Sequence, residues 1–394
     1  MLEALLDAEH HLAPSEIASV IEGLGQAMGA SEVTAYLVDH AQQVLAVLPG
    51  SAAGPEELAV DGTVAGRAFQ TDLIVHGAPV DGQTTFWVPI KDASDRLGVL
   101  KAVASEEEAT SRRLSALASI IAAMVTGRRQ YGDDILLARR RKPMTLAAEM
   151  RWSMLPPLTY EGPGVSVAGV LEPAYEIAGD TFDYGVNGDV VHLAILDAMG
   201  HGLEATLLSA LAISALRNAR RNGLTLQEMV SAADAQIAAQ FGPDKFVTAT
   251  VAELDTDTGV WTWTTCGHPP ALLVRAGKVV KTLDQVVEPP LGLGLLGHAP
   301  EVHSERLQPG DRILLYSDGV VEARNDAGEF FGAERLVDLV TREAAAGLPA
   351  AETLRRLNLA VLAHQEGALQ DDATTVLVEW LVDEAGRSSP SIRG

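Results

Sequence analysis

Acidic residues recur in four short motifs of the C-terminal half of the sequence, each beside a run of apolar residues. In chain order the motifs are AGDTFD, ILDAMGHG, LLYSDGV and LQDDATTV, with the carboxylates Asp180, Asp183, Asp197, Asp318, Asp371 and Asp372. Asp197 and Asp318 each end an apolar run and meet a turn that contains glycine. Because strand ends can share one rim of a sheet, carboxylates that are distant in the sequence can converge there.

Carboxylates brought together repel one another and are costly to remove from water. A hard divalent cation offsets this cost, and ligation by oxygen alone is what Mg²⁺ or Mn²⁺ prefers. The motifs therefore predict a metal site. The alternative is that aspartate beside glycine is simply turn chemistry, which explains one motif better than four.

The elements that would position these motifs are short strands and longer helices between residues 165 and 382. Strands are predicted at VSVAGVLEP, VVHLAILDA, FVTATVAELD, VWTWTTCG, ALLVRAG, RILLYSDG and TTVLVEWL, and helices around 203–221, 226–240 and 333–363. Strands joined mostly by turns, with helices gathered between them, indicate antiparallel sheets covered by helices. The polar tail, 383–394, is predicted to be disordered.

Several stretches of this region occur together in a characteristic order. They are MRWSMLPP, AGDTFDY, ILDAMGHGLEATLLSA, KFVTATVAELD, CGHPPALLV, PLGLGL, LLYSDGVVEARN, FFGAERL and QDDATTVLV. In this order they resemble the PPM-type (type 2C) serine/threonine phosphatases, specifically the bacterial branch of the stage II sporulation phosphatase. The resemblance implies an α-β sandwich over 160–382, with two antiparallel sheets flanked by helices and two Mn²⁺ or Mg²⁺ ions at one edge.

The resemblance also implies roles for individual residues. Asp197 matches the carboxylate that bridges the two metals, and the backbone carbonyl of Ala198 would help to hold one of them. Asp180 matches a further ligand, while Asp318 and Asp371 match the ligands of the other metal. The remaining two carboxylates, Asp183 and Asp372, would act through water or support a ligand. The implied reaction is two-metal hydrolysis, in which a bridging water attacks phosphorus in line. No arginine of the motifs obviously matches a phosphate clamp, and His268 of CGHPP is interpreted as structural.

The N-terminal region, 15–125, has a different pattern. Strands are predicted at VTAYLV (33–38), QVLAVL (43–48), TTFWVPI (84–90) and LGVLKAV (97–103), with helices on one side of the resulting antiparallel sheet, an α+β arrangement. DGTVAGRAFQT (61–71), followed by FWVPIKDASDRLGVLKAV, resembles a GAF domain. This resemblance implies a sensor for a small molecule or a protein signal.

A helical linker is predicted over 126–157. An apolar stripe with heptad spacing leads into it and consists of Leu114, Leu117, Ile121, Met124, Tyr131, Ile135 and Ala138. Such a stripe is typical of a two-helix coiled coil and predicts a homodimer, although a helix packed on its own domain would show the same pattern. A second helix should start with Pro143 in its first turn, with Leu146, Met150 and Met154 on one face, and could carry a signal to the phosphatase.

Composition limits the partners. The net charge is −24 and the isoelectric point is near 4.7, which argues against a long nucleic-acid surface or an anionic membrane as partner. A single cysteine, Cys266, excludes an intrachain disulfide and fits a reducing compartment. No apolar run approaches the roughly 20 residues of a membrane span. These features predict a soluble, cytoplasmic protein.

The sequence therefore predicts a phosphatase that removes phosphate from phosphoserine or phosphothreonine of a signalling protein under the control of the GAF-like region. The resemblance points to a phosphorylated anti-sigma factor antagonist of the STAS type as substrate. Two alternatives remain. One is a non-catalytic scaffold built on a GAF dimer, and the other is a metal-dependent phosphodiesterase or cyclase. The sequence contains no GxxxxGK[ST] loop that would favour a nucleotide.

Overall fold

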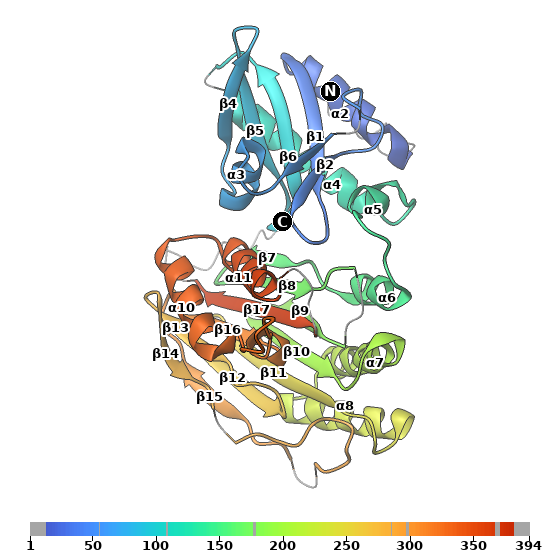
Figure 1. Ribbon diagram of the computed structural model, residues 1–394, viewed down its shortest axis with the longest axis vertical. Helices are drawn as coiled ribbons and strands as arrows, with labels where there is room; N and C mark the ends of the chain where they lie inside the picture. The colour runs from blue at the N-terminus through green and yellow to red at the C-terminus, as the bar shows by residue number, and fades with distance from the viewer. Residues whose placement is uncertain are drawn as a thin grey trace, which may run out of the picture. The chain divides into compact units, whose positions relative to one another are not determined.

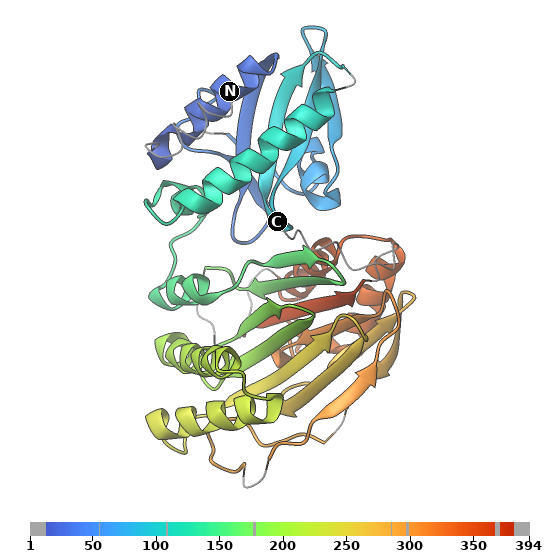
Figure 2. The same cartoon turned by 180° about the vertical axis from the view of Figure 1, so that it is seen from behind.

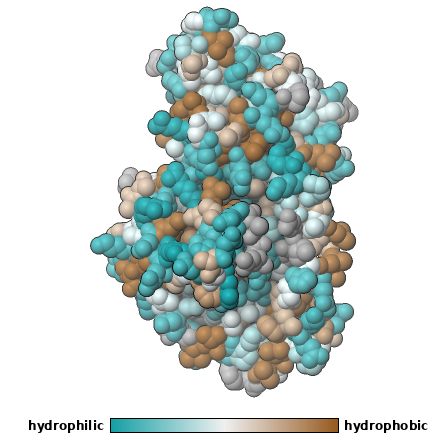
Figure 3. All heavy atoms as spheres, in the orientation of Figure 1, coloured by the Kyte–Doolittle hydropathy of each residue, from teal (hydrophilic) through white to brown (hydrophobic). Residues whose placement is uncertain are grey.

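The computed structural model describes residues 13–54, 56–107, 109–175, 179–284, 286–296, 299–366 and 371–381 (Figure 1). The chain divides into two compact units between Pro143 and Met144. The tail predicted to be disordered, 383–394, lies outside the described residues. None of the helices in the described ranges combines the length and hydropathy needed to cross a bilayer. On the face shown in Figure 3, apolar side chains are scattered among hydrophilic ones.

The N-terminal unit is built on one antiparallel sheet with the strand order β3-β2-β1-β6-β5-β4. Its strands are β1 (Ala30–Val38), β2 (Val44–Val47), β3 (Glu57–Ala59), β4 (Val75–Val80), β5 (Gln83–Asp92) and β6 (Asp95–Ala104). The four strands predicted from the sequence correspond to β1, β2, β5 and β6. The two edge strands, β3 and β4, are the ones that hydropathy did not predict, because they are short or largely exposed.

Helices cover both faces of this sheet, so the prediction of helices on one side was wrong. One face packs against α2 (Ile17–Ala27) and α4 (Thr110–Arg128), and the other packs against α3 (Val64–Thr71). The cause is visible in β1, where Val33 and Leu37 point to the first core while Tyr36 and Val38 point to the second. A strand that is apolar on both faces must be covered on both.

The heptad stripe belongs to the first of these cores. Leu114, Leu117, Ile121 and Met124 of α4 are at most 5% exposed within their own unit, and Ile135 and Ala138 of α5 (Asp134–Ala138) join the same cluster. Figure 2 shows α4 lying across the sheet. The coiled-coil interpretation was therefore wrong, and the homodimer prediction loses its basis in this stripe. Only Tyr131, which is 75% exposed, lies outside the core.

Ile121→Asp should therefore unfold the N-terminal unit rather than separate a dimer. An aspartate in place of this fully buried side chain would lose apolar burial and place an unpaired charge in the core, with an expected destabilisation of at least about 3 kcal/mol. Thermal denaturation and sedimentation would measure this, with Ala116→Asp on the exposed face of α4 as control. An unchanged melting profile accompanied by a dimer-to-monomer change would restore the coiled-coil interpretation.

The second predicted linker helix, α6 (Leu146–Met154), differs from its prediction in two respects. It begins after Thr145, whose side chain accepts a hydrogen bond from the Ala148 amide, and not at Pro143. Its buried residues are Ala147, Ala148 and Arg151, while Leu146 is 64% exposed. The spacing of the apolar residues therefore predicted the wrong buried face of α6. The face that is buried carries a charged residue, Arg151.

The C-terminal unit is a sandwich of two antiparallel sheets, as the sequence predicted. The first sheet has the order β15-β12-β11-β10-β9 and the second has the order β14-β13-β16-β17-β8-β7. The strands are β7 (Thr159–Gly162), β8 (Val165–Glu172), β9 (Thr181–Asn187), β10 (Val190–Ala198), β11 (Val247–Asp255), β12 (Val260–Cys266), β13 (Leu272–Arg275), β14 (Lys278–Thr282), β15 (His303–Arg306), β16 (Arg312–Tyr316) and β17 (Ala373–Trp380). Apolar side chains from both sheets, such as Val167, Ile195 and Trp261, fill the space between them.

Helices cover the outer faces of the sandwich. The first sheet packs against α7 (Gly202–Arg221) and α8 (Leu226–Phe241), and the second packs against α10 (Gly332–Ala345) and α11 (Ala350–His364). Figures 1 and 2 show these two helical layers on either side of the strands. One short helix, α9 (Asp318–Val321), follows β16 directly. Because apolar side chains fill the space between the sheets and helices cover their outer faces, the ends of the strands are where polar side chains of both sheets can meet.

Candidate metal centre

In the first sheet, antiparallel pairing brings two of the acidic motifs together. Asp197 is the penultimate residue of β10, and β9 begins immediately after Asp180. Because Leu196 of β10 pairs with Thr181 of β9, the end of one strand lies beside the start of the other. Asp180 and Asp197 therefore occupy the same rim of the sheet.

The second sheet repeats this geometry. Asp318 follows the end of β16, and Asp371 and Asp372 precede β17, whose Thr375 pairs with Tyr316. A hydrogen bond of 2.6 Å from the Gly179 amide to Asp372 Oδ2 joins this edge to the segment before β9. The rims of the two sheets thus meet at one site.

Two glycines of the motifs permit this close approach. A Cβ atom on Gly179 would lie 2.5 Å from the carbonyl oxygen of Ala198, and one on Gly319 would lie 1.9 Å from the carbonyl oxygen of Asp372. Both distances are far shorter than real contacts allow. Gly179 of AGD and Gly319 of SDG are therefore needed because a side chain at either position would collide with a neighbouring backbone carbonyl.

The pKa shifts show that the carboxylates interact electrostatically. Burial raises the pKa of Asp180 well above its usual value, with Asp197 and Asp372 adding repulsion. Burial, then Asp318 and Asp371, raises the pKa of Asp197 to about 6. Asp197 therefore interacts with carboxylates of both sheets. The structure brings together Asp180, Asp197, Asp318 and Asp371, which were predicted from separate motifs.

The donor atoms fit a hard cation. Asp180 is 2% exposed, and its Oδ2 is buried without a hydrogen-bond partner. An ionised oxygen in such a position is costly unless a positive charge compensates it. Within the described ranges, no three His, Cys, Asp or Glu side chains are already arranged to hold an ion.

Asp183 takes no part in this cluster. Its Oδ1 accepts hydrogen bonds from Arg217 at 2.7 and 3.0 Å, and its Oδ2 accepts one from Arg220 at 3.0 Å. Both arginines belong to α7, and Asp183 is 4% exposed. These contacts argue against the predicted role of Asp183 as a water-mediated ligand. They assign it to the packing of α7 on β9.

His268 is structural, in agreement with its interpretation from the sequence. It is 4% exposed, and its Nδ1 lies 2.9 Å from Oγ1 of Thr248, the residue paired with Asp197 in the sheet. Burial lowers the pKa of His268 to about 3, so the ring is neutral at physiological pH. The residue supports the strand next to the rim and carries no charge into it.

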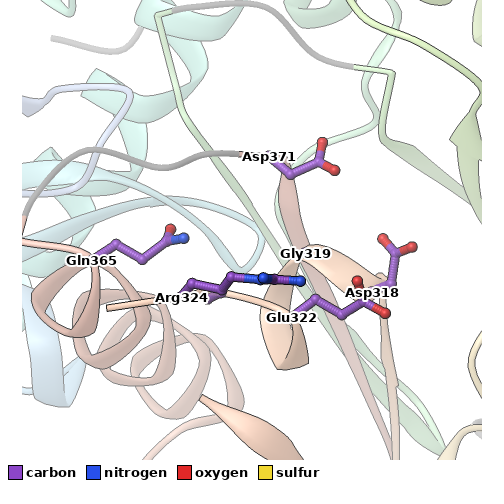
Figure 4. A pocket seen from close by; sticks show the side chains of 7 residues that line it. Asp318, Gly319, Glu322, Arg324, Gln365 and Asp371 are labelled. Atoms are coloured by element: carbon purple, nitrogen blue, oxygen red, sulfur yellow. The ribbon is translucent and has the colours of Figure 1, made fainter. Parts of the chain in front are cut away.

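Two arginines beside the cluster were not recognised from the sequence. Arg151 of α6 is 1% exposed, with Nη1 3.8 Å from Oδ1 of Asp372. Arg324 lines a pocket of about 180 Å³ together with Asp318, Gly319, Glu322, Ala323, Gln365 and Asp371 (Figure 4). Its guanidinium lies 4.4 Å from the centre of the Phe330 ring. Arg324 stood within a quoted motif, LLYSDGVVEARN, but only the structure shows that it shares a pocket with the carboxylates.

The raised pKa values predict how metal-dependent stability should vary with pH. Burial raises the pKa of Asp372 to about 7 and that of Asp197 to about 6, whereas both would ionise near pH 4 in the unfolded chain. These two groups therefore destabilise the metal-free fold progressively as the pH rises from about 4 to 7. Because a cation competes with protons for the same oxygens, Mn²⁺ should raise Tm by roughly 5 °C more at pH 8 than at pH 5. Thermal denaturation with and without Mn²⁺ tests this, and an equal or larger shift at pH 5 would contradict it.

Comparisons with known proteins agree with this site. Residues 187–381 match the family described as Stage II sporulation protein E (SpoIIE). The phosphoserine phosphatase RsbU of Bacillus subtilis is 21% identical over 239 residues, which cover 60% of this chain and 70% of RsbU. The phosphoserine phosphatase RsbP of the same organism is 26% identical over 165 residues, which cover 40% of each chain. A crystal structure of the RsbU and RsbW domains of Rv1364c from Mycobacterium tuberculosis is 29% identical, has a TM-score of 0.49, and covers 56% of this chain and 62% of that one.

The family match falls within the unit that carries the carboxylates. Its range contains Asp197, Asp318 and Asp371, and Asp180 lies a few residues before it. The sandwich of antiparallel sheets and the meeting of motifs at one rim agree with the resemblance inferred from the sequence. Residues 187–381, within the C-terminal unit, therefore form a phosphatase domain of the SpoIIE family.

Proposed function

We propose that this chain is a divalent-metal-dependent phosphatase that hydrolyses phosphoserine or phosphothreonine on a signalling protein. The observation that supports this most strongly is the position of Asp197, whose pKa is raised by burial and by Asp318 and Asp371 of the opposite sheet. Asp197 interacts with Asp180 of its own sheet and with Asp318 and Asp371 of the other sheet. A carboxylate with acidic neighbours on both sides is suited to bridging two cations. This position is difficult to explain as turn chemistry at separate loops.

Two bound Mn²⁺ or Mg²⁺ ions would supply the activated water and the charge neutralisation that hydrolysis of a phosphate ester requires. Asp197 would bridge them, and Asp180 with the carbonyl of Ala198 would complete the ligands on one side. Asp318 and Asp371 would hold the other side. The pocket next to Asp318 and Asp371 also contains Arg324, whose guanidinium can donate hydrogen bonds to two oxygens of an anionic group.

The substrate we propose is a phosphorylated anti-sigma factor antagonist of the STAS type. Two of the relatives are described as phosphoserine phosphatases, and one solved relative joins an RsbU domain to an RsbW domain. We further propose that the N-terminal unit is a GAF-like sensor spanning 15–125, that 126–157 connects it to the phosphatase domain, and that a small molecule or protein signal acts on it. The two-layered covering of its sheet is compatible with that assignment.

The test is a comparison of substrates with the purified chain in Mn²⁺. Phosphate release from a phosphoserine STAS protein should exceed release from the same protein carrying phosphotyrosine, and from a nucleoside triphosphate, by at least about tenfold. Preferential release of phosphate from the nucleoside triphosphate would support a nucleotide phosphohydrolase instead. Binding of the phosphoprotein without release of phosphate would support a scaffold.

A further inference from the structure

Arg151 is a charged side chain enclosed within the C-terminal unit. It is 1% exposed on the inward face of α6, and burial lowers its pKa although Asp372, Asp180 and Glu172 oppose the shift. Removing a guanidinium from water is unfavourable unless charged and polar partners compensate. The partners of Arg151 should therefore indicate why the charge is there.

Those partners lie at the carboxylate rim. Nη1 of Arg151 is 3.8 Å from Oδ1 of Asp372, and Nη2 donates a hydrogen bond to the carbonyl of Pro173. Asp372 in turn accepts hydrogen bonds at Oδ2 from the amides of Gly179, at 2.6 Å, and Asp180, at 3.4 Å. One oxygen of Asp372 thus faces Arg151 while the other holds the backbone that carries the Asp180 carboxylate.

The same helix holds the chain that leaves β8. The Thr145 amide donates to the carbonyl of Tyr175 at 3.2 Å, and the indole N–H of Trp152 donates to the carbonyl of Ala174 at 2.7 Å. With the bond from Arg151 to Pro173, α6 fixes three successive carbonyl groups. Of the three residues that make these hydrogen bonds, Arg151 is the one whose side chain also lies next to a carboxylate of the rim, that of Asp372.

We propose that Arg151 is a positioning residue of the metal centre, which acts through Asp372 to hold Asp180 in place. The inference rests on the proposed function for the identity of the ions, but it assigns Arg151 no contact with substrate or reacting atoms. Charge supports it, because Asp180, Asp197, Asp318, Asp371 and Asp372 would carry five negative charges. The guanidinium of Arg151 is a positive charge that offsets part of this repulsion at Asp372.

A double-mutant cycle on Mn²⁺ affinity tests this inference. Arg151→Met and Asp372→Asn should each weaken Mn²⁺ binding, measured by calorimetry on metal-free protein, by roughly tenfold. The double variant should bind no more weakly than the worse single variant, because both changes break one chain of contacts. Arg151→Lys, which keeps the charge but loses the planar fork, should recover part of the affinity.

Trp152→Phe provides the matched control. It removes a hydrogen bond from α6 to the same chain segment, and that bond ends at the Ala174 carbonyl and not at Asp372, so its effect on Mn²⁺ affinity should be small and additive with Asp372→Asn. If Arg151→Met does not fold, the cycle is run with Arg151→Lys. Additive losses for Arg151 and Asp372, or tighter Mn²⁺ binding after loss of Arg151, would overturn the inference. Because calorimetry needs no substrate, a coupled cycle in a protein without phosphatase activity would contradict the proposed function alone.

Discussion

Asp197→Asn is expected to lower the rate of phosphate release from a phosphoserine substrate by at least about 100-fold while leaving the fold intact. The substitution keeps the shape of the side chain but removes the negative charge that would be shared by both cations. It also relieves the repulsion from Asp318 and Asp371, which helps to raise the pKa of Asp197 to about 6. The metal-free variant should therefore be at least as stable as the native chain at pH 8. Initial rates and thermal denaturation measure the two effects.

The control for this substitution is Asp257→Asn, in an exposed turn away from the rim. It makes the same chemical change and should leave the rate within about twofold of the native chain. Native-like turnover by the Asp197→Asn variant at saturating Mn²⁺ would show that Asp197 does not bridge the reacting centre.

Asp318→Asn and Asp371→Asn should resemble each other and should differ from Asp197→Asn in one respect. Each residue is proposed to be one of several ligands of a single cation, so its loss should weaken affinity before it stops the reaction. At micromolar Mn²⁺ we expect losses of roughly 10- to 100-fold, with partial recovery at millimolar Mn²⁺. The two side chains line the same pocket, so their substitution should affect the same cation (Figure 4).

Rates measured across a Mn²⁺ titration, together with calorimetry, distinguish the possibilities. Recovery of both variants with a raised activation constant supports ligation. If neither variant recovers and calorimetry gives unaltered Mn²⁺ affinity, then Asp318 and Asp371 act on the substrate or on the fold and not as ligands.

Much of the C-terminal fold could be predicted from the sequence because its strands and helices are locally distinct. The runs that become β10, β11 and β17 are rich in apolar and β-branched residues and end at polar turns. The convergence of Asp180, Asp197, Asp318 and Asp371 was also predicted, because strand ends limit where such residues can lie. What local pattern alone could not provide was the antiparallel pairing that places all four at one rim.

The predictions that failed did so because the sequence does not show what a residue packs against. The stripe through Leu117 and Ile121 has the same spacing whether it meets a partner helix or its own sheet, and it meets the sheet. Arg151 was not recognised as a residue of the site, because its partner Asp372 lies 221 positions later in the chain. Asp183 was predicted to act through water or to support a ligand because it shares a motif with Asp180, whereas its hydrogen-bond partners Arg217 and Arg220 lie on a separate helix.

The central claim is that the rim where Asp180, Asp197, Asp318 and Asp371 meet hydrolyses phosphoserine by means of divalent cations. Its most direct test is the initial rate of phosphate release from a phosphoserine protein by chelator-treated enzyme, before and after addition of Mn²⁺, for the native chain and the Asp197→Asn variant. We predict that the native chain is inactive without metal and that Mn²⁺ restores its activity, whereas the variant stays at least about 100-fold slower at every Mn²⁺ concentration. Metal-independent release by the native chain, or equal activation of both proteins, would contradict the account.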